Sequence, residues 1–111
     1  MSEDQIQAKL FQRVWNELPQ TRRLFFSIPN GSSRDVREAV KLKATGLVAG
    51  QPDMCLVWNG KVYGFELKTK QGNVSPQQTK VHEAWKNANA PVFIVRDPDE
   101  GFELIRTIVC E

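Results

Sequence analysis

The dipeptide Asn59-Gly60, set between two runs of apolar residues, predicts a β-hairpin over residues 50–68. A type I′ turn needs two successive residues with positive φ, and Asn followed by Gly adopts that conformation at the lowest cost. A two-residue loop pairs residue 58 with residue 61 and so fixes the register of both strands. Counting outward from this turn places Asp53 directly opposite Glu66.

This pairing brings two acids together on one face of the hairpin. Side chains opposite each other on antiparallel strands lie about 5 Å apart, where two negative charges repel. A fold that keeps such a pair is expected to hold a cation between the carboxylates or to shift the pKa of one strongly. Lys68 is two residues beyond Glu66 and projects from the same face. A solvated pair of surface acids is the simpler alternative.

The first twenty residues predict a helix. Ser2 followed three positions later by Gln5 is typical of a capping box, and Pro19 ends the helix. Glu3 shares the spacing of the inward apolar stripe, although the helix dipole also favours an acid in the first turn. The stripe repeats every four residues, at Ile6, Leu10, Val14 and Leu18.

A short apolar strand is expected over residues 24–28, followed by a basic helix. Ser32 or Ser33 is predicted to cap that helix, which continues to about Thr45 and ends at Gly46. Its charged side chains favour either a solvated face or a surface that contacts phosphates.

The remaining elements follow the hairpin. Ser75, Pro76 and Gln78 together predict a helix start, with Ser as the N-cap. The apolar run 91–96 predicts a central strand covered on both faces and parallel to the strand before it. Residues 98–110 form either a closing helix or a terminal strand. The buried stripe of the helix after Ser75 is expected at Val81, Ala84, Trp85 and Ala88.

These elements predict an α/β fold with one mixed sheet flanked by helices, in the order α-β-α-β-β-α-β-α. A length of 111 residues favours a single domain over 1–111. No apolar run approaches the length of a membrane span, and the N-terminus lacks the features of a signal peptide. Two cysteines, Cys55 and Cys110, form neither a disulfide framework nor a zinc site. We therefore expect a cytoplasmic protein.

The residue types at the hairpin favour divalent-cation chemistry. Carboxylate oxygens select Mg²⁺ or Mn²⁺ over zinc, and a cation held there can activate water for attack on a phosphodiester while Lys68 stabilises the growing charge. Other reactions have less support: His82 has no nucleophile partner and is more simply structural, and no glycine-rich nucleotide loop is present. The adjacent lysine and the small size argue against a retaining glycosidase.

Several linked motifs run along the chain in a characteristic order. They are Ile28-Pro29-Asn30-Gly31, Arg34, the stretch 42–53 that ends in Gln51-Pro52-Asp53, Phe65-Glu66-Leu67-Lys68-Thr69, and Ser75-Pro76-Gln77-Gln78. From Glu3 to about Arg96, this pattern resembles the VRR-NUC family of the PD-(D/E)xK nuclease superfamily. The resemblance implies a restriction-endonuclease-like core and Mg²⁺- or Mn²⁺-dependent cleavage of DNA, often of branched DNA such as four-way (Holliday) junctions.

The same resemblance assigns roles to individual residues. It implies metal ligation by Asp53, Glu66, the backbone carbonyl of Leu67 and Glu3, and catalytic roles for Asp53, Glu66, Lys68, Gln78 and Glu3. Small stand-alone members resemble homodimers, and cutting two strands symmetrically also requires two sites related by a two-fold axis. The formal charge of +2 allows DNA as a partner without requiring it. Candidate DNA contacts are Asn30, Arg34, Arg37, Lys43, Arg22 and Arg23.

Two other functions remain open at this point. A non-catalytic DNA-binding module could keep the same fold, and a restriction-type nuclease of the same superfamily would cut linear duplex DNA. Neither a membrane nor a nucleotide cofactor is expected.

Overall fold

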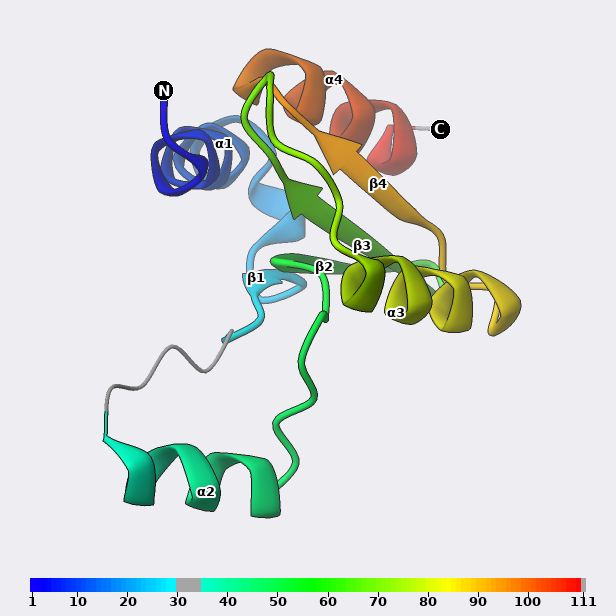
Figure 1. Ribbon diagram of the computed structural model, residues 1–111. Coiled ribbons are helices and arrows are strands. Elements are labelled where there is room, and N and C mark those ends of the chain that lie inside the picture. Colours follow the sequence, from blue (N-terminus) through cyan, green and yellow to red (C-terminus); the bar gives the residue numbers. More distant parts are fainter. Residues whose placement is uncertain (30–34, 111) are drawn as a thin grey trace.

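A mixed four-stranded sheet forms the centre of the protein (Figure 1). The computed structural model describes residues 1–29 and 35–110. The strands lie in the order β1 (Phe25–Ser27), β2 (Met54–Trp58), β3 (Lys61–Leu67) and β4 (Val92–Val95). The pairs β1·β2 and β2·β3 are antiparallel, and β3·β4 is parallel as the sequence predicts. The predicted fold class is therefore confirmed.

The hairpin has the predicted register. Asn59 and Gly60 have φ values of 48° and 75°, so both adopt the left-handed conformation that a type I′ turn requires. Trp58 pairs with Lys61, and Met54 pairs with Phe65. Asp53 lies one residue before β2 and, by the same register, falls opposite Glu66.

Helices cover both faces of the sheet (Figure 1). Helices α1 (Glu3–Glu17) and α4 (Pro98–Val109) pack against each other and against one face, and the 3₁₀ turn η1 (Pro19–Thr21) connects α1 to β1. Helix α3 (Pro76–Asn87) lies beside β3 and β4 and covers the other face. Residues of β3 alternate between the two faces, so Phe65 and Leu67 face α1 while Gly64 and Glu66 face α3.

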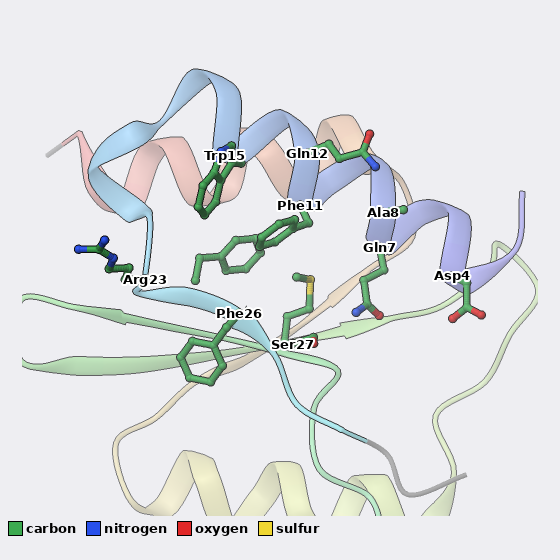
Figure 2. Close-up of a pocket in the computed structure, with 11 residues that line it drawn as sticks. Asp4, Gln7, Ala8, Phe11, Gln12, Trp15, Arg23, Phe26 and Ser27 are labelled. Carbon is green, nitrogen blue, oxygen red and sulfur yellow. The ribbon is translucent and has the colours of Figure 1, made fainter. Parts of the chain in front are cut away.

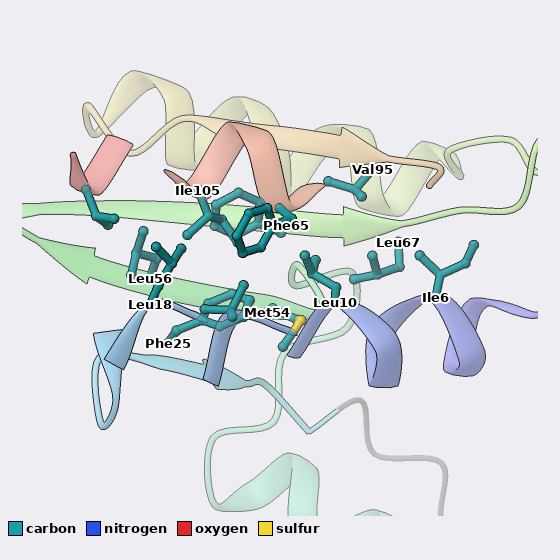
Figure 3. Close-up of a cluster of buried hydrophobic side chains, with 13 residues drawn as sticks. Ile6, Leu10, Leu18, Phe25, Met54, Leu56, Phe65, Leu67, Val95 and Ile105 are labelled. Atoms are coloured by element: carbon teal, nitrogen blue, oxygen red, sulfur yellow. The ribbon is translucent and has the colours of Figure 1, made fainter. Parts of the chain in front are cut away.

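The apolar core lies between the sheet and the α1–α4 pair (Figure 3). The predicted stripe of α1 is buried, and its capping box at Ser2 and Gln5 is present. Residues 98–110 form a helix for most of their length, with Asp97 as the N-cap, which settles the alternative left open by the sequence. The core cluster consists of Ile6, Leu10, Val14, Leu18, Phe25, Met54, Leu56, Phe65, Leu67, Val95, Phe102, Ile105 and Val109.

Two predictions about the C-terminal half were wrong. Strand β4 is an edge strand rather than a central one. Its apolar run reflects coverage by α3 on one face and α4 on the other, which does not require a strand on both sides. In α3, Val81 is buried and Trp85 is half-buried, but Ala84 and Ala88 are exposed, because only part of the helix contacts the sheet.

Helix α2 (Val36–Ala44) lies apart from the sheet and buries none of its residues (Figure 1). Its N-cap is Asp35, whose side chain accepts a hydrogen bond of 2.9 Å from the backbone N–H of Arg37. The prediction of a cap at Ser32 or Ser33 was therefore wrong, and both serines lie outside the described residues. Gly46 has a φ of 114°, as expected of a residue that ends the helix.

No helix in the described part of the chain is long and apolar enough to cross a membrane. Both cysteines are free thiols, with Cys55 buried and Cys110 exposed.

Gly64 is needed where α3 meets the hairpin. A Cβ at this position would lie 2.9 Å from Cγ of Pro52, 3.0 Å from Cζ3 of Trp85 and 3.1 Å from Cγ2 of Val92. Because these neighbours are stiff or packed, Gly64→Ala is expected to lower the free energy of unfolding by about 1–3 kcal/mol in urea denaturation. Val57→Ala, on the partly exposed side of the same hairpin, serves as the control and should cost less. Equal stability of Gly64→Ala and the wild type would contradict this packing.

Candidate functional site

Asp53 and Glu66 form a carboxyl pair at the end of the hairpin. The backbone of Asp53 is held by the residue that follows β1, since Ile28 N–H donates to the Asp53 carbonyl at 2.8 Å. Its side chain points across the ladder, where Oδ2 accepts a 2.8 Å hydrogen bond from Leu67 N–H. Glu66 lies in the middle of the sheet with only 1% of its surface exposed, and a hydrogen bond joins its carboxyl group to that of Asp53.

Two side chains of α3 contact Glu66. The Nε2 atom of Gln78 donates to Oε2 of Glu66 at 3.3 Å, and the Nε2 atom of His82 lies 3.1 Å from Oε1. Gln78 and His82 are one helical turn apart and therefore lie on the same side of the helix. The Glu66 carboxyl group is thus enclosed by Asp53 and by two residues of one helix.

The environment of Glu66 strongly disfavours its negative charge. Burial is the largest cause, and the hydrogen bond to Asp53 and its charge add to it, so that the pKa of Glu66 rises to about 8. Burial also lowers the pKa of His82 below its usual range. At neutral pH in the absence of a cation, both groups are therefore mainly uncharged, and their contact is a hydrogen bond rather than an ion pair.

Lys68 and Glu3 act on this carboxyl pair from two sides. Lys68 is 8% exposed, and its positive charge lowers the pKa values of both Glu66 and His82. Glu3 lies in the first turn of α1, and its negative charge helps to raise the pKa of Glu66. The side chain of Glu3 is exposed and not inward-facing as the spacing predicted, because the buried stripe of α1 begins one turn later, at Ile6.

Gln78 connects the start of α3 to the site. Its Oε1 accepts a 2.9 Å hydrogen bond from Ser75 N–H, and its backbone N–H donates to Oγ of Ser75 at 3.1 Å, which completes the predicted capping box. The same side-chain amide uses its Nε2 on Glu66. A single conformation of Gln78 therefore serves both roles that the sequence suggests, which are capping α3 and contacting the site.

A second contact ties α3 to the segment that carries Asp53. Nε1 of Trp85 donates to Oε1 of Gln51 at 2.9 Å. The backbone at Gly50 also passes so close to Gln77 that a Cβ there would lie 2.9 Å from its carbonyl oxygen. Helix α3 therefore contacts Glu66 directly and also contacts the segment just before Asp53, so it helps to position both members of the carboxyl pair.

The residues at this position fit a hard divalent cation. Within residues 1–29 and 35–110, no three or more His, Cys, Asp and Glu side chains are grouped so as to hold a metal ion. A cation would depend on the two carboxylates of Asp53 and Glu66, completed by backbone oxygen or water, which is how Mg²⁺ is commonly bound. The buried Glu66, whose pKa is raised by burial and by the facing Asp53, is the feature that favours such a cation.

The predicted DNA contacts are distributed over two regions. Arg22 donates from Nε to the carbonyl of Trp15 at 3.0 Å and lies over the Trp15 ring. Arg23 is exposed beside β1. Arg37 and Lys43 are exposed on α2, and Asn30 and Arg34 lie outside the described residues.

A cavity of about 660 Å³ lies between α1 and β1 (Figure 2). Its lining is largely apolar and includes Phe11, Trp15 and Phe26. Neither Asp53 nor Glu66 lines this cavity, so the cavity is separate from the candidate metal site.

His82 is the site member that the sequence did not reveal. The sequence shows a lone histidine without a nearby nucleophile, whereas its partner is a carboxyl group on a strand sixteen residues earlier. The available signal was its spacing of four residues from Gln78, which places both side chains on one side of α3.

Comparison with known structures identifies the fold. A solved structure described as a VRR_NUC domain protein superposes with a TM-score of 0.80 and 17% sequence identity, covering 99% of this chain and 89% of that one. The fold is that of a VRR_NUC domain. No protein-family model matches the sequence, and no curated protein matches it. The VRR_NUC likeness at this identity establishes the arrangement of the elements around the hairpin.

The raised pKa of Glu66 predicts how the stability of the metal-free protein depends on pH. A carboxyl group whose pKa rises on folding contributes stability that is present below its unfolded pKa and is lost as pH rises through its folded pKa. The wild type in EDTA should therefore lose roughly 2–4 kcal/mol of unfolding free energy, relative to Glu66→Gln, between pH 5 and pH 8. Urea denaturation of both proteins across this range measures the difference. A constant difference would show that Glu66 titrates normally.

Proposed function

We propose that this protein is a member of the VRR-NUC family and a Mg²⁺- or Mn²⁺-dependent endodeoxyribonuclease that cuts branched DNA such as four-way junctions. The observation that carries the proposal is the buried Glu66 opposite the half-buried Asp53 and beside the buried Lys68, on the fold of a VRR_NUC domain. An acid pair of this kind is costly to bury and is explained by a divalent cation between its members. The motif resemblance supports DNA as the substrate.

The carboxylates of Asp53 and Glu66 would hold the cation, together with the backbone carbonyl of Leu67 and with Glu3 on the exposed side. When bound, the cation would polarise a phosphodiester and lower the pKa of an attacking water. Asp53 is suited to this task because the hydrogen bond from Leu67 N–H to its Oδ2 fixes the orientation of its carboxylate. The cation would also replace the proton that stabilises the pair at neutral pH.

Lys68 would stabilise the negative charge that develops on the phosphoryl oxygens. Its ammonium group acts electrostatically on Glu66 and His82 from a largely buried position, where a charge interacts more strongly than in water. Gln78 would hold Glu66 in place through its Nε2. Exposed basic residues on α2 and near β1 would contact DNA phosphates, namely Arg37, Lys43, Arg22 and Arg23. Asn30 and Arg34, outside the described residues, complete that proposed set.

A cleavage assay on synthetic four-way junctions tests this function. The wild type should nick the junction with Mg²⁺ or Mn²⁺ and be inactive in EDTA. Asp53→Asn, Glu66→Gln and Lys68→Ala should each reduce the rate by at least about 100-fold, because each removes a charge near the reacting phosphate. Lys86→Ala, which removes an exposed lysine from α3, is the matched control and should cut normally. Full activity of Lys68→Ala would contradict the catalytic role proposed for Lys68.

The substrate panel separates the remaining alternatives. Equal cleavage of linear duplex and junction DNA would identify a restriction-type nuclease. Junction binding that is unchanged by EDTA, without any hydrolysis, would identify a DNA-binding module.

We further infer that two copies associate, so that two sites can act on opposite strands. Helix α2 supports this, since Val36 and Val40 lie one turn apart and expose 76% and 62% of their surfaces. A helix with exposed apolar residues and no buried ones is stabilised poorly on its own. A second copy that covers this side of α2 would bury these valines.

Sedimentation equilibrium tests the association. The wild type should sediment as a dimer, and a double variant Val36→Asp and Val40→Asp should sediment as a monomer that keeps its thermal unfolding transition. Val57→Asp, at a less exposed valine on the hairpin, is the control and should remain dimeric. A dimeric double variant would exclude α2 from the interface, and a monomeric wild type would exclude the dimer.

A further inference from the structure

We propose that His82 is a positioning residue for Glu66, holding one carboxylate oxygen so that the other side of the group is presented to a divalent cation. This inference rests on the proposed function, because it concerns the same carboxyl pair. It assigns to His82 a role that neither the motif resemblance nor the chemistry of Asp53, Glu66 and Lys68 requires.

The first step is that the two contacts from α3 reach different oxygens. His82 Nε2 lies 3.1 Å from Oε1, and Gln78 Nε2 donates to Oε2 at 3.3 Å. A carboxyl group held at one oxygen can still rotate about its terminal torsion, which is broad and poorly restricted by itself. Contacts at both oxygens from one helix fix the plane of the group.

The second step is that the Gln78 contact has a defined direction. Oε1 of Gln78 accepts from Ser75 N–H, so its Nε2 must be the end that faces Glu66. When Glu66 is ionised it can only accept, and His82 must then present an N–H from Nε2. The two residues therefore act as a pair of donors on the ionised form of Glu66.

The third step is that these contacts leave room for a cation. Each carboxylate oxygen can accept about two hydrogen bonds or metal contacts, so one donor on each oxygen leaves a site on each. The side of Glu66 next to Asp53 is where the two carboxyl groups already meet. His82 and Gln78 thus each use one position on Glu66 and leave a second position on each oxygen for a cation shared with Asp53.

The fourth step is that α3 provides a rigid base for this contact. Val81 is buried, and Trp85 in the next turn is bound to Gln51 at 2.9 Å, so the helix is fixed on both sides of His82. The His82 side chain itself is only 14% exposed. A donor held this firmly restricts Glu66 at little further entropy cost.

Two loss variants and one rescue variant test the role. His82→Phe keeps a planar ring of similar size but has no donor, and His82→Asn keeps an amide that is too short to reach Oε1. His82→Gln places an amide nitrogen near the position of Nε2 and should restore the contact. Glu83→Gln, at an exposed residue of the same helix, is the matched control.

Mn²⁺ binding by the protein alone, measured by isothermal titration calorimetry, is the first readout. His82→Phe and His82→Asn should bind Mn²⁺ about tenfold more weakly, as expected for one hydrogen bond to a charged group. His82→Gln and Glu83→Gln should bind within about twofold of the wild type. Equal binding by His82→Phe and the wild type, or a failure of His82→Gln to rescue, would overturn the proposal.

Crystal structures of the metal-free wild type, His82→Phe and His82→Asn give the second readout. The Glu66 carboxyl group should be rotated or spread over two conformers in the folded loss variants and single in the wild type. An unmoved Glu66 in the loss variants would overturn the positioning role, even if metal binding changed. If the wild type binds no Mn²⁺, the proposed nuclease function fails, while the metal-free structures still decide the role of His82.

Discussion

The opposition of Asp53 and Glu66 across the hairpin is the constraint on which the site depends. The turn at Asn59-Gly60 imposes it through the register, and the hydrogen bonds to Asp53 from Ile28 and Leu67 keep it in place. Glu66 is buried opposite the half-buried Asp53, and burial together with Asp53 raises the pKa of Glu66 to about 8, so Glu66 retains its proton at neutral pH when no cation is bound. The electrostatic cost of this arrangement is the physical reason for the proposed divalent cation, which would offset it.

Helix α3 converts this pair into an ordered site. The capping box that starts the helix also orients the Gln78 amide toward Glu66, and the following turns contribute His82 and Trp85. Gly64 lets the helix approach the sheet closely enough for these contacts. Local folding signals and site geometry therefore share the same residues, so a substitution that loosens α3 disturbs both.

The sequence predicted the features that depend on short-range geometry. The register of the hairpin, the capping boxes at Ser2 and Ser75 and the order of elements were confirmed, because turns and caps are set by neighbouring residues. The position of β4 at the sheet edge and the exposure of Ala84 were not predictable in the same way. They depend on how far one element covers another, which periodicity does not reveal. His82 was missed for the same reason, since its partner is distant in sequence.

The state of Glu66 also links cation binding to protons. With a pKa of about 8, Glu66 is mostly protonated at neutral pH in the metal-free protein. The proposed cation would need Glu66 in its ionised form, so part of its binding free energy would be used for ionisation and its affinity would rise with pH until Glu66 is ionised. The positive charge of Lys68 lowers the pKa of Glu66, which favours the ionised form and would reduce this cost. In the proposed site, the α3 contacts would therefore orient the carboxylate, while Lys68 would govern how readily it becomes a ligand.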